Sequence, residues 1–272
     1  MAVTQTDYSG DQVGAAKSVM LELARLLGEY RDDIVIIGGW VPGLLFPGHV
    51  GSIDIDLALN HMKLQDAGYA TIERLLLSRG YRKSDQQPYI FYRTVVVSGR
   101  EIDVEVDLLA GEYAGTGRNR RHQNIQDVKA RKARGCDLAF DLTSEVTISG
   151  SPPDGGQDTA KVRVASVVPF VVMKGMALHD RLKEKDAYDI YFCLKNYPDG
   201  LDALVTEFRP HASRGLVQEA LGKIAEKFAT AEQVGPVHVA DFLEIENVED
   251  RALLQRDVFE RVNYLLRELV AE

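Results

Sequence analysis

The sequence contains very little cysteine. Its 272 residues include two cysteines, Cys136 and Cys193, which stand in unrelated contexts and form no Cys-x-x-Cys pair. Two isolated cysteines cannot build the disulfide framework that many small secreted domains need. We therefore expect a reducing compartment and a core that forms without disulfides or a structural metal.

Long apolar runs are missing too. No stretch approaches the roughly 20 apolar residues that a membrane-spanning helix requires. The first residues, MAVTQTDYSGDQVG, lack the basic segment and apolar run of a signal peptide. These absences predict a cytoplasmic protein with no membrane partner, and the 45% content of hydrophobic residues is that of an ordinary globular chain.

Positive charge is in short supply, since the formal net charge is −9. Such an acidic chain is not a general coat for nucleic acid, so any such contact must come from a local basic segment. One segment contains only a single acid, Asp127, among its basic residues. Those residues are Arg118, Arg120, Arg121, Lys129, Arg131, Lys132 and Arg134. The segment is either a solvated loop or a site that binds the phosphate backbone of RNA. Arg118, Arg120 and Arg121 are the candidate RNA contacts.

Hydrophobic periodicity predicts an α+β fold with a mixed sheet and flanking helices, followed by a helical C-terminal region. Strands are expected at 34–37, 53–59, 89–97 and 101–109, with further short strands within 136–150 and 160–166. Helices are expected at 13–30, 40–45, 66–78, 169–182, 186–196, 216–229 and 250–270, and residues 111–134 are expected to be a polar loop. We place a catalytic core at 1–165 and a helical domain at 166–272.

Two carboxylates stand in the segment Gly51-Ser52-Ile53-Asp54-Ile55-Asp56-Leu57. Side chains two residues apart point to the same face of a strand, so Asp54 and Asp56 project together. Paired carboxylates repel each other unless a cation lies between them, and Mg²⁺ prefers such oxygen ligands. The pair predicts a metal site, although a solvated sheet edge is the alternative.

A second acidic face is expected on the strand that contains Asp103, Glu105 and Asp107, which alternate with apolar residues. If this strand lies beside the first, a third carboxylate joins Asp54 and Asp56. Three carboxylates can clamp two metal ions, one on each side of an in-line displacement. The alternative is that all three acids of this face are exposed to solvent.

Glycine and basic residues supply candidate phosphate contacts. Gly38 and Gly39 follow a strand and precede a helix, where glycine lets backbone N–H groups approach phosphate oxygens. The hydroxyl of Ser52 can add a contact. Lys174 and Arg181 fall on one side of a helix, where Lys174 can reach the β- and γ-phosphates, unless both are surface cations paired with nearby acids.

The Gly-Gly pair, the Gly-Ser-x-Asp-x-Asp motif and a later acid resemble the DNA polymerase β-like nucleotidyltransferase superfamily. The segment Lys174-x-x-Ala177-Leu178-x-x-Arg181, followed by Lys185-Asp186-x-Tyr188-Asp189-Ile190, resembles the AbiEii-type toxins of bacterial abortive-infection and toxin–antitoxin systems. The resemblance covers residues 34–195.

This resemblance implies a metal-dependent nucleotidyltransferase that uses an NTP with Mg²⁺ or Mn²⁺, releases pyrophosphate and modifies an RNA such as tRNA. It implies that Asp54 and Asp56 hold metal, and that Ser52 and Lys174 contact the triphosphate. The resemblance also implies that Asp189 is the last acidic residue of the family's motif and one of the catalytic residues. Asp107 is favoured as the third metal ligand because it stands in Val-Asp-Leu-Leu, with Asp103 and Glu105 left as alternatives.

Two other functions compete with this expectation. A small-molecule nucleotidyltransferase of the aminoglycoside-modifying kind would use the same core, and the acidic chain suits a cationic substrate. The second competing function is a nucleotide-binding or partner-binding module that does not catalyse a reaction. A toxin role would further imply a cognate antitoxin.

Overall fold

The computed structural model describes residues 3–65, 70–113 and 121–270 and divides the chain into two compact units. The first, the sheet unit, comprises Tyr8–Leu45 and Gly51–Pro169. The second, the helical unit, comprises Met1–Asp7, Phe46–Val50 and Phe170–Glu272. The sequence suggested one division, at residues 165 and 166, whereas two short N-terminal segments belong to the helical unit.

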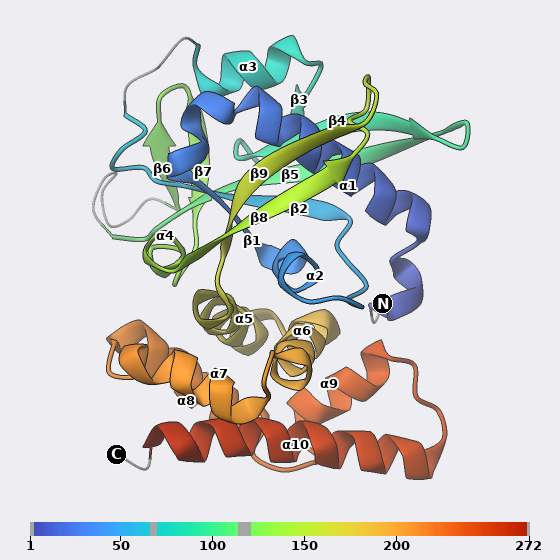
Figure 1. The fold of residues 1–272 in the computed structure, drawn as a ribbon, viewed down its shortest axis with the longest axis vertical. Helices are drawn as coiled ribbons and strands as arrows, with labels where there is room; N and C mark the ends of the chain where they lie inside the picture. Colours follow the sequence, from blue (N-terminus) through green and yellow to red (C-terminus); the bar gives the residue numbers. More distant parts are fainter. Residues whose placement is uncertain (1–2, 66–69, 114–120, 271–272) are drawn as a thin grey trace. The chain divides into compact units, whose positions relative to one another are not determined.

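The sheet unit is built on one mixed sheet with the strand order β3-β4-β5-β2-β1-β9-β8, to which β7 and β6 are attached through β5 (Figure 1). Its strands are β1 (Ile34–Ile37), β2 (Asp54–Leu59), β3 (Arg82–Lys83), β4 (Ile90–Val97), β5 (Arg100–Ala110), β6 (His122–Ile125), β7 (Val128–Lys132), β8 (Thr143–Gly150) and β9 (Asp158–Ala165). β1 pairs antiparallel with β2 and parallel with β9, and β2 pairs parallel with β5. The mixed sheet with its helices confirms the predicted fold class.

Helix α1 (Gly10–Leu26) packs against this sheet, where it contacts β4, β5, β8 and β9 (Figure 1). It begins earlier than predicted because the Ser9 side chain accepts a hydrogen bond from the Gln12 amide and caps its first turn. Val19, Met20 and Leu23 are buried, as their helical spacing predicted. The shorter helices of this unit are η2 (Gly28–Asp33), η3 (Gly38–Trp40), α2 (Val41–Leu45), α3 (Ile72–Ser78) and α4 (Leu138–Asp141).

Two local predictions in the sheet unit were wrong. The segment expected to be a polar loop contains the antiparallel hairpin β6–β7, in which Ile125, Val128 and Ala130 are buried. Charged residues alternate with these apolar ones and obscured the strand pattern. The strand expected from residue 136 begins only at Thr143, and α4 occupies the residues before it.

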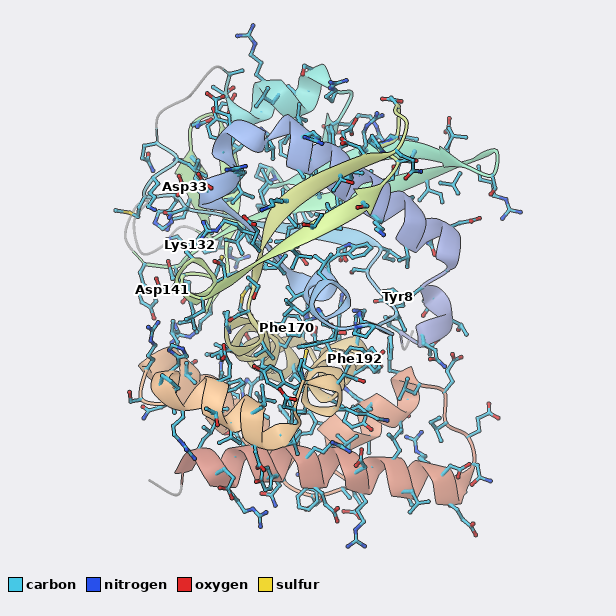
Figure 2. All side chains as sticks on the ribbon, in the orientation of Figure 1. Tyr8, Asp33, Lys132, Asp141, Phe170 and Phe192 are labelled. Carbon is cyan, nitrogen blue, oxygen red and sulfur yellow. The ribbon has the colours of Figure 1, made fainter. Side chains whose placement is uncertain are left out.

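The helical unit contains α5 (Val167–Arg181), which starts at the end of the sheet unit, and five further helices among the described residues. These are α6 (Glu184–Asn196), α7 (Leu201–Phe208), α8 (Gly215–Lys227), α9 (Val234–Phe242) and α10 (Val248–Val270), with the 3₁₀ turns η1 (Gln5–Asp7) and η4 (Arg209–His211). α10 packs against α6, α7, α8 and α9. The side chains of Phe170 on α5 and Phe192 on α6 are buried (Figure 2).

Helices α7 and α9 were not predicted. In α9, Gly235 and Pro236 lie in the first helical turn, where proline is tolerated. A Cβ at Gly235 would approach the ring of Phe228 to 2.6 Å, so a larger residue would not fit there. None of the described helices is long and apolar enough to cross a membrane.

Candidate active site

The candidate acids of the sheet unit lie on one face of the sheet. β2 and β5 pair in parallel, and the register places Asp54 opposite Glu105 and Asp56 opposite Asp107. Paired residues on neighbouring strands point to the same side, so four carboxylates share this acidic face. The condition under which the sequence placed a third acid beside Asp54 and Asp56, that the second acidic strand lies beside the first, is met.

Gly38 lies against one of these carboxylates. Its φ is +69°, and a Cβ at this position would stand 1.8 Å from Oδ2 of Asp56. Only glycine combines this backbone conformation with such a close approach. Gly39 follows as a buried residue of η3, so the Gly-Gly pair shapes the end of β1 beside Asp56.

Ser52 is buried, and its hydroxyl donates a hydrogen bond to Oδ1 of Asp54. This bond fixes the carboxylate relative to the turn at Gly51, whose φ is +86°. The predicted contact of Ser52 with phosphate stays a prediction. It would require the single O–H of Ser52 to turn away from Asp54.

The three acids of β5 differ in their surroundings. Asp103 has a side chain that is 52% exposed and binds Arg82, and Glu105 accepts a hydrogen bond from Tyr92. Asp107 is buried and binds Arg131 of β7. Asp107 is therefore the acid of this strand that adjoins Asp56 in a buried position, which supports the preference for it.

Burial raises the pKa of Asp107 to about 6, although the guanidinium of Arg131 acts in the opposite direction. The nearby carboxylates of Glu105 and Asp54 raise this pKa further. Its Oδ1 atom is buried and has no hydrogen-bond partner among the described residues. A carboxylate with a raised pKa and an unpartnered oxygen can accept a proton.

A divalent cation fits the acidic face best at Asp54 and Asp56. Both carboxylates project from β2 on the same side, and the Asp56 carboxylate packs directly against Gly38, where any side chain would collide with it. The described residues contain no group of three or more acids, histidines or cysteines arranged to hold a metal ion. Coordination by Asp107 therefore stays a prediction.

The Lys/Asp motif forms a buried ion cluster inside the helical unit. The Nζ atom of Lys174 lies 2.7 Å from a carboxylate oxygen of Asp186 and 2.7 Å from one of Asp189. Arg181 binds Asp186 at 2.7 Å, and Lys185 binds Asp189 at 3.0 Å. Helical spacing within α5 and α6 brings these residues together.

Charge is retained throughout this cluster. Burial opposes ionisation, but the ion pairs outweigh it: they raise the pKa of Lys174 and lower the pKa of both Asp186 and Asp189. Lys174 is thus already paired within its own unit. Its predicted contact with the triphosphate, like that of Arg181, stays a prediction.

His49 belongs to the same cluster and was missed at the sequence level. Its Nε2 atom lies 2.9 Å from Oδ1 of Asp189, and its ring stacks on Tyr188 with 5.4 Å between ring centroids. Burial lowers the pKa of His49 despite the carboxylate partner. The ring is therefore neutral near pH 7 and donates from Nε2. No local motif could reveal a partner 140 residues away.

The candidate RNA contacts can be placed only in part. Arg118 and Arg120 lie outside the described residues, whereas Arg121 is exposed immediately before β6. Lys129 is exposed on β7. The β6–β7 hairpin thus presents basic side chains at the surface, although Arg131 of the same strand turns to Asp107.

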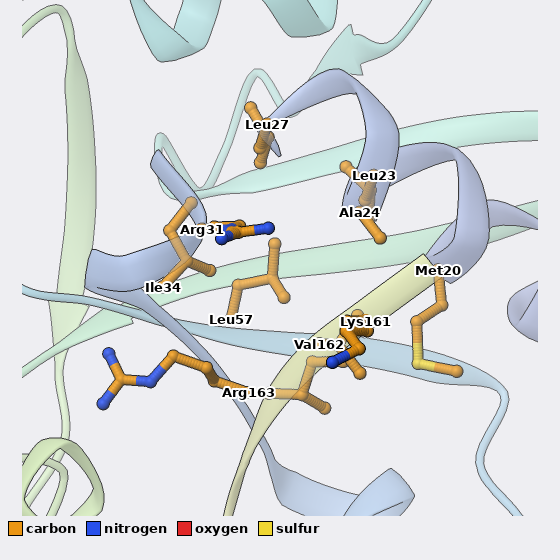
Figure 3. Close-up of a pocket in the computed structure, with 11 residues that line it drawn as sticks. Met20, Leu23, Ala24, Leu27, Arg31, Ile34, Leu57, Lys161, Val162 and Arg163 are labelled. Carbon is orange, nitrogen blue, oxygen red and sulfur yellow. The ribbon is translucent and has the colours of Figure 1, made fainter. Parts of the chain in front are cut away.

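Figure 3 shows an apolar pocket of the sheet unit. Met20, Leu23 and Leu27 of α1 line it together with Leu57 of β2. Leu57 alternates with Asp56 along β2, so the two side chains point to opposite faces. The pocket is therefore separate from the acidic face.

No curated protein matches the sequence. A solved structure described as a "putative nucleotidyltransferase from H. pylori" aligns with a TM-score of 0.46 and 13% identity, over 97% of this chain and 98% of that one. A family model described as "Nucleotidyl transferase AbiEii toxin, Type IV TA system" matches residues 23–264. That match spans the acidic face, the glycine pair and the Lys/Asp motif, and the chain belongs to the AbiEii family of nucleotidyltransferase toxins.

Proposed function

We propose that this chain transfers a nucleoside monophosphate from an NTP to a hydroxyl group and releases pyrophosphate, with Mg²⁺ or Mn²⁺ as cofactor. The observation that supports this reaction is the register of β2 with β5, which places Asp54 and Asp56 beside Asp107 on one face. Gly38 lies directly against Asp56. Family membership supports the same reaction class.

Asp54 and Asp56 would hold the cation, which supplies positive charge to the phosphate oxygens when bound. Ser52 holds Asp54 in place through its hydroxyl. The backbone at Gly38 and Gly39 can approach phosphate closely because Gly38 has no side chain. Catalysis then depends on positioning and electrostatics rather than on a covalent intermediate with the protein.

RNA is the acceptor that we propose, with tRNA as the first to test. The exposed basic residues Arg121 and Lys129 of the β6–β7 region support it, because the remainder of the chain is acidic. The family's description as a toxin of a TA system supports a cognate antitoxin as partner. A small cationic acceptor remains the competing substrate class.

The decisive experiment supplies each α-labelled NTP separately with Mg²⁺ and total bacterial RNA. We expect label in a tRNA-sized band with the wild type and a loss of about 10²-fold or more in Asp54→Asn, because a ligand charge is removed. Asp103→Asn is the matched control: it removes an acid of the same face that is exposed and paired with Arg82.

The outcomes separate the candidate functions. Label in RNA that survives Asp54→Asn would overturn the assigned site. Absence of label in any RNA, together with adenylylation of an aminoglycoside, would establish the small-molecule function. If calorimetry shows that NTP binds but no turnover occurs with Mg²⁺ or Mn²⁺, the chain is a nucleotide-binding module and not an enzyme.

A further inference from the structure

Arg131 stands in a position that neither the motifs nor the family description assigns. It lies on β7, which pairs with β5 so that Arg131 is opposite Leu109. Leu109 and Asp107 are two residues apart on β5 and point to the same face. Arg131 therefore enters the acidic face from the neighbouring strand.

The contact between Arg131 and Asp107 is more than a surface ion pair. Asp107 is buried, and one of its carboxylate oxygens accepts a hydrogen bond from Nη2 of Arg131. The guanidinium carbon also lies 5.8 Å from the centroid of the Tyr89 ring. An aromatic face and a buried carboxylate together hold the guanidinium in one place.

This arrangement conflicts with a second metal ion on Asp107. A cation bound there would share the carboxylate with a guanidinium that is permanently charged. Across the described residues, no three ligating side chains are arranged to hold a metal. Asp54 and Asp56 lie two residues apart on β2 and point to the same face.

We propose that Arg131 takes the place of a second divalent cation by neutralising Asp107, so that the acidic face holds a single ion on Asp54 and Asp56. The proposal rests on the metal-dependent function proposed above. It assigns Arg131 a positioning role: the guanidinium fixes the Asp107 carboxylate and supplies a fixed positive charge beside the metal-binding pair.

The test counts the Mn²⁺ ions bound per chain by electron paramagnetic resonance of free Mn²⁺, in the presence of a non-hydrolysable NTP analogue. We expect one ion in the wild type. Arg131→Gln should bind two, because Asp107 loses its cation, and the double variant Arg131→Gln/Asp107→Asn should return to one. Arg82→Gln is the matched control, since it removes an arginine paired with Asp103 on the same face, and should bind one.

Two ions in the wild type, none in the wild type, or one in a folded Arg131→Gln would each overturn the proposal. If Arg131→Gln does not fold, Asp107→Asn decides it: one ion with an affinity within about threefold supports the proposal, and the loss of an ion or a tenfold weaker affinity contradicts it. A wild type that binds one ion but transfers no label would overturn the nucleotidyltransferase function and leave the role of Arg131 intact.

Discussion

Gly38 has a backbone φ of +69° and leaves no room for a side chain beside Asp56. The glycine of the motif is thus required by two independent constraints, backbone conformation and contact. The first constraint costs stability in any non-glycine variant. The second acts on a proposed metal ligand and should therefore affect activity.

Gly38→Ala should reduce nucleotide transfer by about 10²-fold, because the new methyl group displaces the Asp56 carboxylate by an ångström or more. Gly99→Ala is the control for backbone strain alone: its φ is +78°, and a Cβ there meets nothing within 4 Å. Gly99→Ala should lose about 1 kcal/mol of unfolding free energy, measured in urea, and Gly38→Ala should lose more because of its collision with Asp56. Equal activity in the two variants would show that the contact with Asp56 does not matter.

His49 should make the protein sensitive to mild acid. Its pKa in the folded state lies below that of the unfolded chain because the ring is buried. The unfolded chain therefore binds more protons as the pH falls below about 6.5, and the unfolding free energy decreases in that range. The charged groups that face the ring are Asp189, Lys174 and Lys185.

Urea unfolding at pH 7.5 and 5.5 tests this expectation. The wild type should lose more unfolding free energy between the two pH values than His49→Gln, which cannot take up the proton. His179→Gln, on the partly exposed surface of α5, should match the wild type. If His49→Gln shows the same pH difference as the wild type, the buried ring does not titrate on unfolding.

At the scale of elements, the pair α5 and α6 is joined by charges rather than by apolar contacts alone. Lys174 of α5 is buried between Asp186 and Asp189 of α6. Removing one member of a buried ion cluster leaves uncompensated charge, which costs about 3–5 kcal/mol. Lys174 is therefore expected to matter for folding before any contact with substrate.

Lys174→Met should lower the unfolding free energy by about 3 kcal/mol, measured by urea titration at pH 7.5. Lys161→Met should leave it nearly unchanged, because its partner Glu145 lies at the surface and screening weakens the pair. A Lys174→Met protein with unchanged stability but no activity would instead support the direct phosphate contact predicted from the sequence.

The sequence predicted best the elements in which apolar and polar residues follow a regular strand or helix pattern. β1 and β2 were found nearly residue by residue, since β-branched runs and alternating acids leave little ambiguity. The pairing of β2 with β5 meets the condition under which the sequence placed a third acid beside Asp54 and Asp56. The hairpin β6–β7 was missed because its buried residues Ile125 and Val128 sit among polar ones.

The candidate site was predictable only where it is local in sequence. Asp54, Asp56 and Gly38 stand in one short segment, and the motif revealed them. In the helical unit, His49 joins the ion cluster through Asp189. In the sheet unit, Arg131 joins the acidic face through Asp107. No residue spacing encodes such partners, because the sheet register and the helix packing bring them together.

At the scale of the whole molecule, the net charge of −9 makes any RNA contact depend on a small basic surface. Arg121 and Lys129 are exposed there. Each phosphate contact that a cation makes releases a counterion, so the affinity falls with salt in proportion to the number of contacts.

Replacing Arg121 and Lys129 together by alanine should weaken tRNA binding and reduce the slope of log affinity against log salt by about 1 to 2. Filter binding at several salt concentrations measures both quantities. Lys161→Ala should leave the slope unchanged. It removes a cation of β9 that is paired with Glu145 of β8. An unchanged slope in the double variant would place the RNA contacts elsewhere.

The assignment of Phe46–Val50 to the helical unit has a consequence for fragments of this protein. A piece that begins at residue 166 retains Asp189 but not its imidazole partner, so it loses a buried hydrogen bond that no residue in that piece replaces. Cutting the chain once, between residues 165 and 166, therefore separates the helical unit from its segment Phe46–Val50. Expression of the separated parts, or exchange of the C-terminal part between relatives, should produce insoluble or protease-sensitive products unless His49 is supplied with it.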